Sequence, residues 1–273
     1  MWRIFEMRNL TTMLMLRGQV VHTVVADALQ SVKTGQRIDA RIAKQRITDV
    51  IRARYMESAK RLWHFDNRPP GRKQSEITSL IEHYYQFPGI HERARESQII
   101  AWKCVENLIN SDYWAGIVQS DTNDWREIDG ETFPTFDLDG IQIYAKPDFA
   151  HTCGSPTIVD WKTGSPSRQD PKQLMLYSLY AKWKWNWNPL ETKLAAVYLQ
   201  PDFRIEEFTP SAKDIETVKN EVKESFKAMT DIEPTFGPAN VDDFPMTENK
   251  SECTWCRFQR ICKMLEEREQ NKL

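Results

Sequence analysis

The sequence predicts an α/β fold, and three observations lead to this prediction. Helical periodicity runs through the N-terminal third, strand-like alternation begins at Trp125, and a helical pattern returns at about Pro171. With 273 residues, 40% of them hydrophobic, the chain is long enough to bury a sizeable core. We therefore expect a mixed sheet flanked by helices, with an N-terminal helical insertion and a Cys-rich C-terminal tail.

The composition indicates which classes of protein the chain can belong to. The net charge is −2, from 37 basic and 39 acidic residues, so the chain as a whole lacks the basic character of many nucleic-acid binders. The sequence has no run of about eighteen apolar residues and no signal-peptide pattern at its start, so we expect a cytoplasmic protein that does not enter a membrane. Most of the ten Trp residues belong in the core, and exposed aromatic residues can stack on unpaired bases.

The N-terminal third is predicted to be helical. A first helix carries Gly18 and His22 within residues 1–36, and residues 37–66 read as one long basic amphipathic helix. That helix is equally consistent with a phosphate-facing wall and with a solvated face. After a Pro/Gly-rich loop at residues 67–73, we expect two more helices, at residues 76–87 and about 91–113.

From Trp125 the pattern predicts strands joined as a meander, with turns at Asp129-Gly130 and Asp139-Gly140. Residues 143–149 and 157–159 read as two short strands joined by a turn. A helix from about Pro171 to Trp185, a strand pair at residues 194–200 and 204–209, and a helix capped by Ser211 complete the prediction.

Two carboxylates mark the ends of the two short strands. Asp148 and Asp160 should meet at neighbouring positions, and close carboxylates need a cation such as Mg²⁺ or Mn²⁺ between them. Because side chains alternate along a strand, Asp160 and Lys162 share one face. A lysine beside a metal site can orient water and offset charge on a phosphoryl group, so this pattern favours phosphodiester hydrolysis. Glu127 is a further acidic residue, equally readable as an exposed strand residue.

These motifs resemble the PD-(D/E)xK nuclease superfamily, in its RecB-like branch. The resemblance rests on Pro147-Asp148, on Asp160-x-Lys162 twelve residues later, and on a following Gln-x-x-x-Tyr at Gln173 and Tyr177. It implies a restriction-endonuclease-like core and Mg²⁺- or Mn²⁺-dependent DNA cleavage.

The resemblance also implies roles for individual residues. Asp148, Asp160 and the backbone carbonyl of Trp161 would be metal ligands, together with His22 of the Gly-x-x-x-His pattern; a histidine on an apolar helix face is also often a core residue. Lys162 would position the water. Gln173 and Tyr177, one helical turn apart, would contact substrate or support the lysine.

Three of the five cysteines lie close together, at Cys253, Cys256 and Cys262. Their spacing suits one metal ion or iron–sulfur cluster, and it resembles the C-terminal part of the iron–sulfur staple in CRISPR-associated adaptation nucleases and AddB-type subunits. A [4Fe–4S] cluster takes four ligands, and no cysteine precedes His22. We expect a truncated start; the alternatives are substitution by Cys104, Cys153 or a non-protein ligand, a lost cluster, a zinc site, or simple buried thiols.

We therefore expect one nuclease domain over residues 1–273. Its parts are a first core helix region (1–36), a helical insertion (37–120), a catalytic α/β core (121–232) and the Cys-rich tail (233–273). The predicted function is a DNA exonuclease acting on single-stranded ends, in repair, recombination, phage DNA processing or CRISPR adaptation, with proteins of those pathways as further partners. The alternative is a non-catalytic DNA-binding or scaffold protein that keeps a nuclease-like core.

Overall fold

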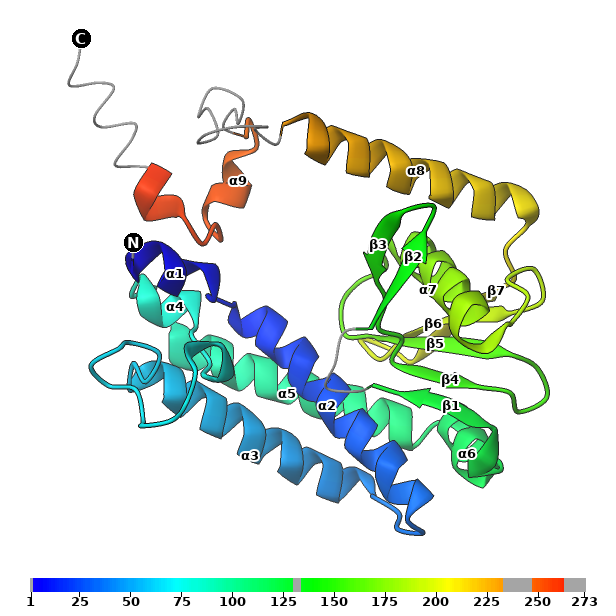
Figure 1. The fold of residues 1–273 in the computed structure, drawn as a ribbon. Coiled ribbons are helices and arrows are strands. Elements are labelled where there is room, and N and C mark those ends of the chain that lie inside the picture. Colours follow the sequence, from blue (N-terminus) through cyan, green and yellow to red (C-terminus); the bar gives the residue numbers. More distant parts are fainter. Residues whose placement is uncertain (1, 130–133, 233–246, 263–273) are drawn as a thin grey trace. The chain divides into compact units, whose positions relative to one another are not determined.

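The computed structural model describes residues 2–129, 134–232 and 247–262 (Figure 1). Within them the chain forms two compact units. One unit comprises residues 2–19, 48–99 and 247–262, and the other comprises residues 20–47, 100–129 and 134–232. No helix of the described residues is long and apolar enough to cross a membrane.

The second unit is built on a five-stranded mixed sheet in the order β1-β4-β5-β6-β7. β5 and β6 are parallel, and the other neighbours are antiparallel. The sheet confirms the predicted α/β class. The strands are β1 (Trp125–Ile128), β4 (Phe149–His151), β5 (Thr157–Lys162), β6 (Lys193–Tyr198) and β7 (Arg204–Phe208).

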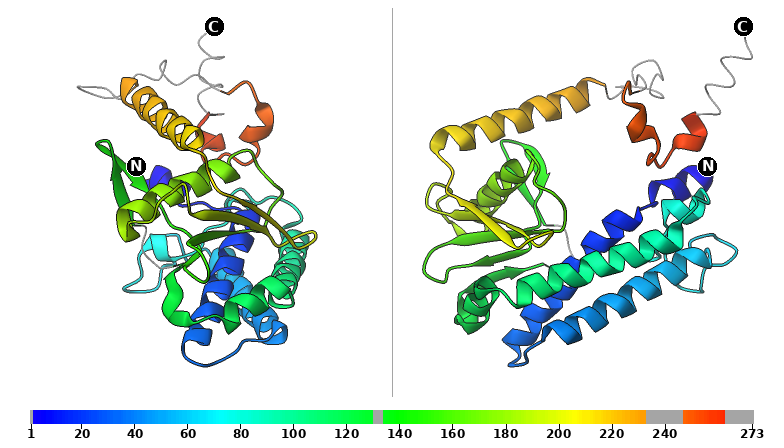
Figure 2. Two further views of the ribbon diagram at one scale, coloured as in Figure 1. Left: turned by 90° about the vertical axis from the view of Figure 1, so that its right-hand side faces the viewer. Right: turned by 180° about the vertical axis from the view of Figure 1, so that it is seen from behind.

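Helix α7 (Asp170–Trp185) is the crossover between the parallel strands β5 and β6. It lies between the sheet and α8 (Ala212–Asp231) in the views of Figures 1 and 2. Leu174 of α7, Ile158 of β5 and Val218 of α8 belong to one buried cluster, which explains this layering. The predicted cap of α8 is confirmed, because the Ser211 side chain accepts a hydrogen bond from the Asp214 N–H.

The predicted meander is wrong. β2 (Thr135–Leu138) and β3 (Ile141–Tyr144) form a separate two-stranded sheet, while β1 pairs with β4. The Asp139-Gly140 turn is present, with positive φ at both residues; Gly130 of the other predicted turn lies outside the described residues. The expected strand at 143–149 is two strands separated by Pro147, whose nitrogen has no hydrogen to donate to a ladder.

The helices of the N-terminal third are shorter than predicted. α3 (Ala40–Ala59) ends seven residues before Asp66, and Arg61 just beyond it has a left-handed φ of 54°. The segment expected as a helix at 76–87 contains only the single turn α4 (Ile81–Tyr84), and the short 3₁₀ helix η1 (Gln74–Glu76) ends at its first residue. α5 (Ile90–Ile109) stops where Ser111 caps a new helix, α6 (Asp112–Gln119).

In the first unit, residues 254–262 lie against the N-terminal helix α1 (Trp2–Arg8) and α4. Ile261 packs on a small core of Met7, Leu10 and Ile81. The Tyr85 hydroxyl donates a 2.6 Å hydrogen bond to the Arg257 carbonyl oxygen, after α9 (Lys250–Cys253). Helices α2 (Met13–Lys33), α3 and α5 contribute residues to both units.

Candidate active site

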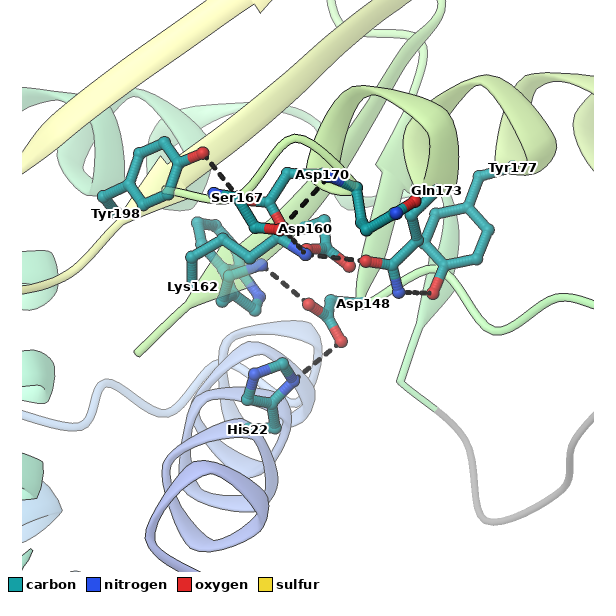
Figure 3. Close-up of polar contacts among 11 residues, drawn as sticks. His22, Asp148, Asp160, Lys162, Ser167, Asp170, Gln173, Tyr177 and Tyr198 are labelled. Carbon is teal, nitrogen blue, oxygen red and sulfur yellow. Dashed lines mark hydrogen bonds and ion pairs between the residues drawn. The ribbon is translucent and has the colours of Figure 1, made fainter. Parts of the chain in front are cut away.

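The two predicted carboxylates meet across the β4–β5 pair. Phe149 is paired with Val159 in the antiparallel register, so Asp148 and Asp160 extend the two strands at opposing positions. Both are almost fully buried, at 6% and 3% exposure. The backbone N–H of Trp161 donates a 2.7 Å hydrogen bond to Oδ2 of Asp148, which fixes that carboxylate at the end of β5 (Figure 3).

Helix α2 supplies the histidine. Val21 and Val25 are buried and hold one side of this helix in the core, while the His22 ring reaches Asp148. His22 Nδ1 lies 2.8 Å from Asp148 Oδ1 (Figure 3). The predicted meeting of His22 with Asp148 is thus present, and Asp148 is held from two sides by residues 126 and 13 positions away.

Asp129 is a third carboxylate at this site, although the sequence pattern indicates only a turn at this position. It follows β1, and its backbone N–H donates a 2.7 Å hydrogen bond to the Asp148 carbonyl oxygen. One carboxylate oxygen each of Asp129 and Asp148 and one His22 ring nitrogen all lie within 4.8 Å of one another. Asp129 also forms a 2.6 Å ion pair with Lys146.

Glu127, the acidic residue that the sequence offered instead, makes an ion pair with Lys184 of α7. It is separated from Asp129 by one residue. The signal that could have found Asp129 is its place directly after a strand, since such positions gather at a sheet edge. Using that signal required knowing that β1 pairs with β4 rather than with β2.

Lys162 lies on the same face of β5 as Asp160, as predicted. Its Nζ is 2.6 Å from Asp160 Oδ2 and donates a 2.6 Å hydrogen bond to Gln173 Oε1. A third acceptor is Asp170, whose Oδ1 is 3.2 Å from Nζ. Sequence reasoning missed Asp170, although its spacing of three residues from Gln173 on a helix could have indicated it.

Gln173 and Tyr177 are one turn apart on α7 and contact each other. Gln173 Nε2 donates a 2.8 Å hydrogen bond to the Tyr177 hydroxyl, while its Oε1 accepts from Lys162 (Figure 3). The amide thereby orients the lysine on one side and is itself oriented by the tyrosine. Of the two roles that the resemblance implied, this contact favours support of the lysine.

Several ionisable side chains of the site lie close together in a buried environment, which shifts their pKa values. Burial and the neighbouring Asp148 carboxylate raise the pKa of Asp160 to about 7, although Lys162 opposes both effects. Burial alone would lower the pKa of His22, but the carboxylates of Asp148, Asp160 and Asp129 raise it to about 9. The side chains therefore retain protons that a cation would displace.

The donor set fits a hard divalent metal ion. His22 offers an imidazole nitrogen, and Asp129 and Asp148 offer carboxylate oxygens close enough together to share one ion. The Trp161 N–H points toward Asp148, and the carbonyl of a strand residue faces the same side as its N–H. The Trp161 carbonyl therefore lies on the β4 side of β5 as well.

A comparison with protein-family models decides the class. The model described as PD-(D/E)XK nuclease superfamily matches residues 6–263. The chain belongs to the PD-(D/E)XK nuclease superfamily. Its members are in general nucleases that use divalent metals, which agrees with the donor set at the sheet edge of this PD-(D/E)XK chain. A search of curated proteins finds no match.

Three of the five cysteines, Cys253, Cys256 and Cys262, lie far from these strands in the sequence. Cys253 ends α9 and is exposed, and Cys256 and Cys262 are partly exposed in the same unit. Cys104, buried in α5, and Cys153, which follows β4, belong to the other unit. Among the described residues, the group of three side chains able to hold a metal is His22, Asp129 and Asp148, and it includes no cysteine.

Proposed function

We propose that the protein is a metal-dependent deoxyribonuclease. Its active site, which contains Asp148, Asp160 and Lys162, would hydrolyse phosphodiester bonds. The observation that carries this proposal is the convergence of these three side chains with His22 at one sheet edge. Isolated acidic residues on a surface would carry no such inference. In this protein the two aspartates are buried, and Lys162 and His22 lie beside them.

His22, Asp129, Asp148 and Asp160, with the Trp161 carbonyl, are the residues that would hold Mg²⁺ or Mn²⁺. When bound, such an ion supplies positive charge at the scissile phosphate and makes water more acidic. The residues of the chain do the rest. Lys162 directs its ammonium group to the space beside Asp160, where it offsets negative charge on the phosphoryl group and orients the attacking water.

Gln173 and Tyr177 serve the lysine in this proposal. Because Gln173 accepts from Lys162 and donates to Tyr177, the pair restricts the rotamers of a flexible four-carbon side chain. Holding a reacting group in place contributes to rate by reducing the entropy lost in the transition state. Contact of Tyr177 with the substrate is a secondary role.

The finer assignment rests on the resemblance of the motifs to the RecB-like branch. We propose exonuclease action on single-stranded DNA ends, in repair, recombination or CRISPR adaptation. The test is a cleavage assay on single and double strands labelled at the 5′ or the 3′ end, with Mg²⁺, Mn²⁺ or EDTA. Shortening from one labelled end supports an exonuclease, internal fragments support an endonuclease, and binding without cleavage in any metal supports the scaffold alternative.

A metal cluster on Cys253, Cys256 and Cys262 is a separate part of the proposal. Its support is their spacing and their common location beside α9 in one unit. Anaerobic purification tests it. A brown protein that absorbs near 400 nm and loses this absorption in Cys256→Ser indicates an iron–sulfur cluster; a colourless protein with stoichiometric zinc indicates a zinc site, and a metal-free protein contradicts both.

A further inference from the structure

The Lys162 ammonium has as many close acceptors as it has hydrogens. An ammonium donates three hydrogen bonds, and Nζ of Lys162 has Asp160, Gln173 and Asp170 around it at 2.6, 2.6 and 3.2 Å. The first belongs to the strand that carries the lysine, and the other two belong to α7. The direction of the lysine is therefore set by the start of this helix as well as by β5.

Asp170 is itself held in place. Its Oδ2 accepts a 2.8 Å hydrogen bond from the Tyr198 hydroxyl and a 2.9 Å hydrogen bond from the Ser167 N–H, which leaves Oδ1 facing Lys162 (Figure 3). Asp170 is 8% exposed and Tyr198 is 3% exposed. A buried carboxylate with both oxygens engaged has little freedom to rotate, so the position of Oδ1 is fixed.

The sheet explains why Tyr198 reaches this group. Lys162 and Tyr198 are paired in the parallel register of β5 and β6, so both side chains leave the same face of the sheet side by side. α7, the crossover between these two strands, begins at Asp170 just above that face. The topology thus brings together residues from three successive elements: Lys162 of β5, Asp170 of α7 and Tyr198 of β6.

We propose that Asp170, held by Tyr198, is a positioning residue that keeps the Lys162 ammonium directed at Asp160 during the cleavage proposed above. This inference rests on the proposed function. Asp170 carries a negative charge 3.2 Å from the ammonium, so it limits the orientations that Lys162 can adopt. Tyr198 acts one step further away by fixing Asp170.

A purely structural role for Asp170 makes different predictions. Its carboxylate also accepts the Ser167 N–H at the start of α7, as a residue that only stabilises the helix end would. In that case its loss lowers stability to the same extent whether or not Lys162 is present. If Asp170 positions Lys162, the two residues are energetically coupled.

The first experiment compares the steady-state kinetics of the full-length protein with those of Asp170→Asn and Tyr198→Phe. An amide at position 170 keeps the shape but loses the charge and cannot accept from all three donors. We expect kcat to fall about 10-fold for Asp170→Asn and less for Tyr198→Phe, with KM changed by less than about twofold. The matched control is Glu221→Gln, which breaks the ion pair between Glu221 of α8 and Lys172 of α7 and should leave kcat unchanged.

The second experiment measures thermal unfolding for Asp170→Asn in the parent protein and in Lys162→Met. The proposal predicts a midpoint lower by about 3 °C in the parent and a clearly smaller decrease in Lys162→Met, where the carboxylate has already lost its cation and only its bonds to Ser167 and Tyr198 are affected. Equal decreases in both backgrounds, or an unchanged kcat in Asp170→Asn, would overturn it. If the parent cleaves no nucleic acid, the proposed function fails, and the unfolding cycle still decides whether Asp170 holds Lys162.

Discussion

The backbone N–H of Trp161 and the carboxylate of Asp148 are joined by a 2.7 Å hydrogen bond. Through it, the strand that carries Asp160 and Lys162 also fixes the first aspartate of the site. The other oxygen of Asp148 remains directed at His22. The Asp148 carboxylate therefore links β4, β5 and α2. One of its oxygens accepts from a backbone N–H, and the other faces the position that a cation would occupy.

The first prediction concerns Asp148→Asn. An amide at this position has one oxygen and one NH₂ group, so it cannot accept from Trp161 and also offer an anionic oxygen beside His22. We expect the affinity for Mn²⁺ to fall about 100-fold or more, measured by calorimetry. Asp137→Asn, which alters an exposed carboxylate of the β2–β3 sheet, should leave the affinity unchanged. Equal affinities for Asp148→Asn and the parent would remove Asp148 from the metal site.

Asp129 gives a second prediction with a matched control on the same strand. Asp129→Asn should weaken Mn²⁺ binding about 10-fold, because one of the three close donor groups loses its charge. Glu127→Gln removes a carboxylate two residues earlier that pairs with Lys184 instead, and should have little effect. A larger loss from Glu127→Gln than from Asp129→Asn would contradict the placement of Asp129 among the ligands.

The sequence predicts those residues of the site that lie close together along the chain, and it does not predict those that come from distant segments. Asp148, Asp160 and Lys162 follow from two adjacent strands, and Gln173 and Tyr177 follow from helical spacing, so local patterns were sufficient. Asp129 depends on β1 pairing with β4 across a separate hairpin, which alternation cannot reveal. Tyr198 depends on the parallel register with β5. Such pairings are set by packing between distant segments, and turn signals alone gave a meander that does not form.

The third prediction concerns pH. Asp160 has its pKa raised from 3.8 to about 7, and His22 from 6.5 to about 9, so at these two side chains the folded metal-free protein binds more protons than the unfolded chain. Stability from these groups is complete below the unfolded pKa of each and is lost as the pH rises through 7 and then 9. Burial lowers the pKa values of His83 and His151, which act in the opposite direction up to about pH 7.5. The melting temperature without metal should therefore fall between pH 7.5 and 8.5, and added Mn²⁺ should raise it more at pH 8.5 than at pH 7.5.

The same protons should be released when the metal binds. At pH 7.5 His22 is largely protonated in the metal-free protein, and a ligand imidazole must be neutral. We expect the calorimetric heat of Mn²⁺ binding to differ between two buffers in proportion to their ionisation enthalpies. Identical heats in both buffers would mean that His22 keeps its proton and is not a ligand.

The fourth prediction separates Gln173 from Tyr177. Gln173→Leu removes an acceptor of the Lys162 ammonium, so the single-turnover cleavage rate should fall about 10- to 100-fold. Tyr177→Phe leaves that acceptor in place and removes only the partner of the amide, so a loss below about 10-fold is expected. If Tyr177→Phe were the more damaging change, contact with substrate rather than support of the lysine would be its main role.

The most direct test of the account is single-turnover cleavage of end-labelled single-stranded DNA by the parent, Asp160→Asn and Lys162→Met, with Mg²⁺ or Mn²⁺ and with EDTA. Circular dichroism would establish that each variant is folded. The account predicts metal-dependent cleavage by the parent, none in EDTA, and a loss of at least about 1,000-fold in both folded variants. Undiminished metal-dependent cleavage by either folded variant would contradict it.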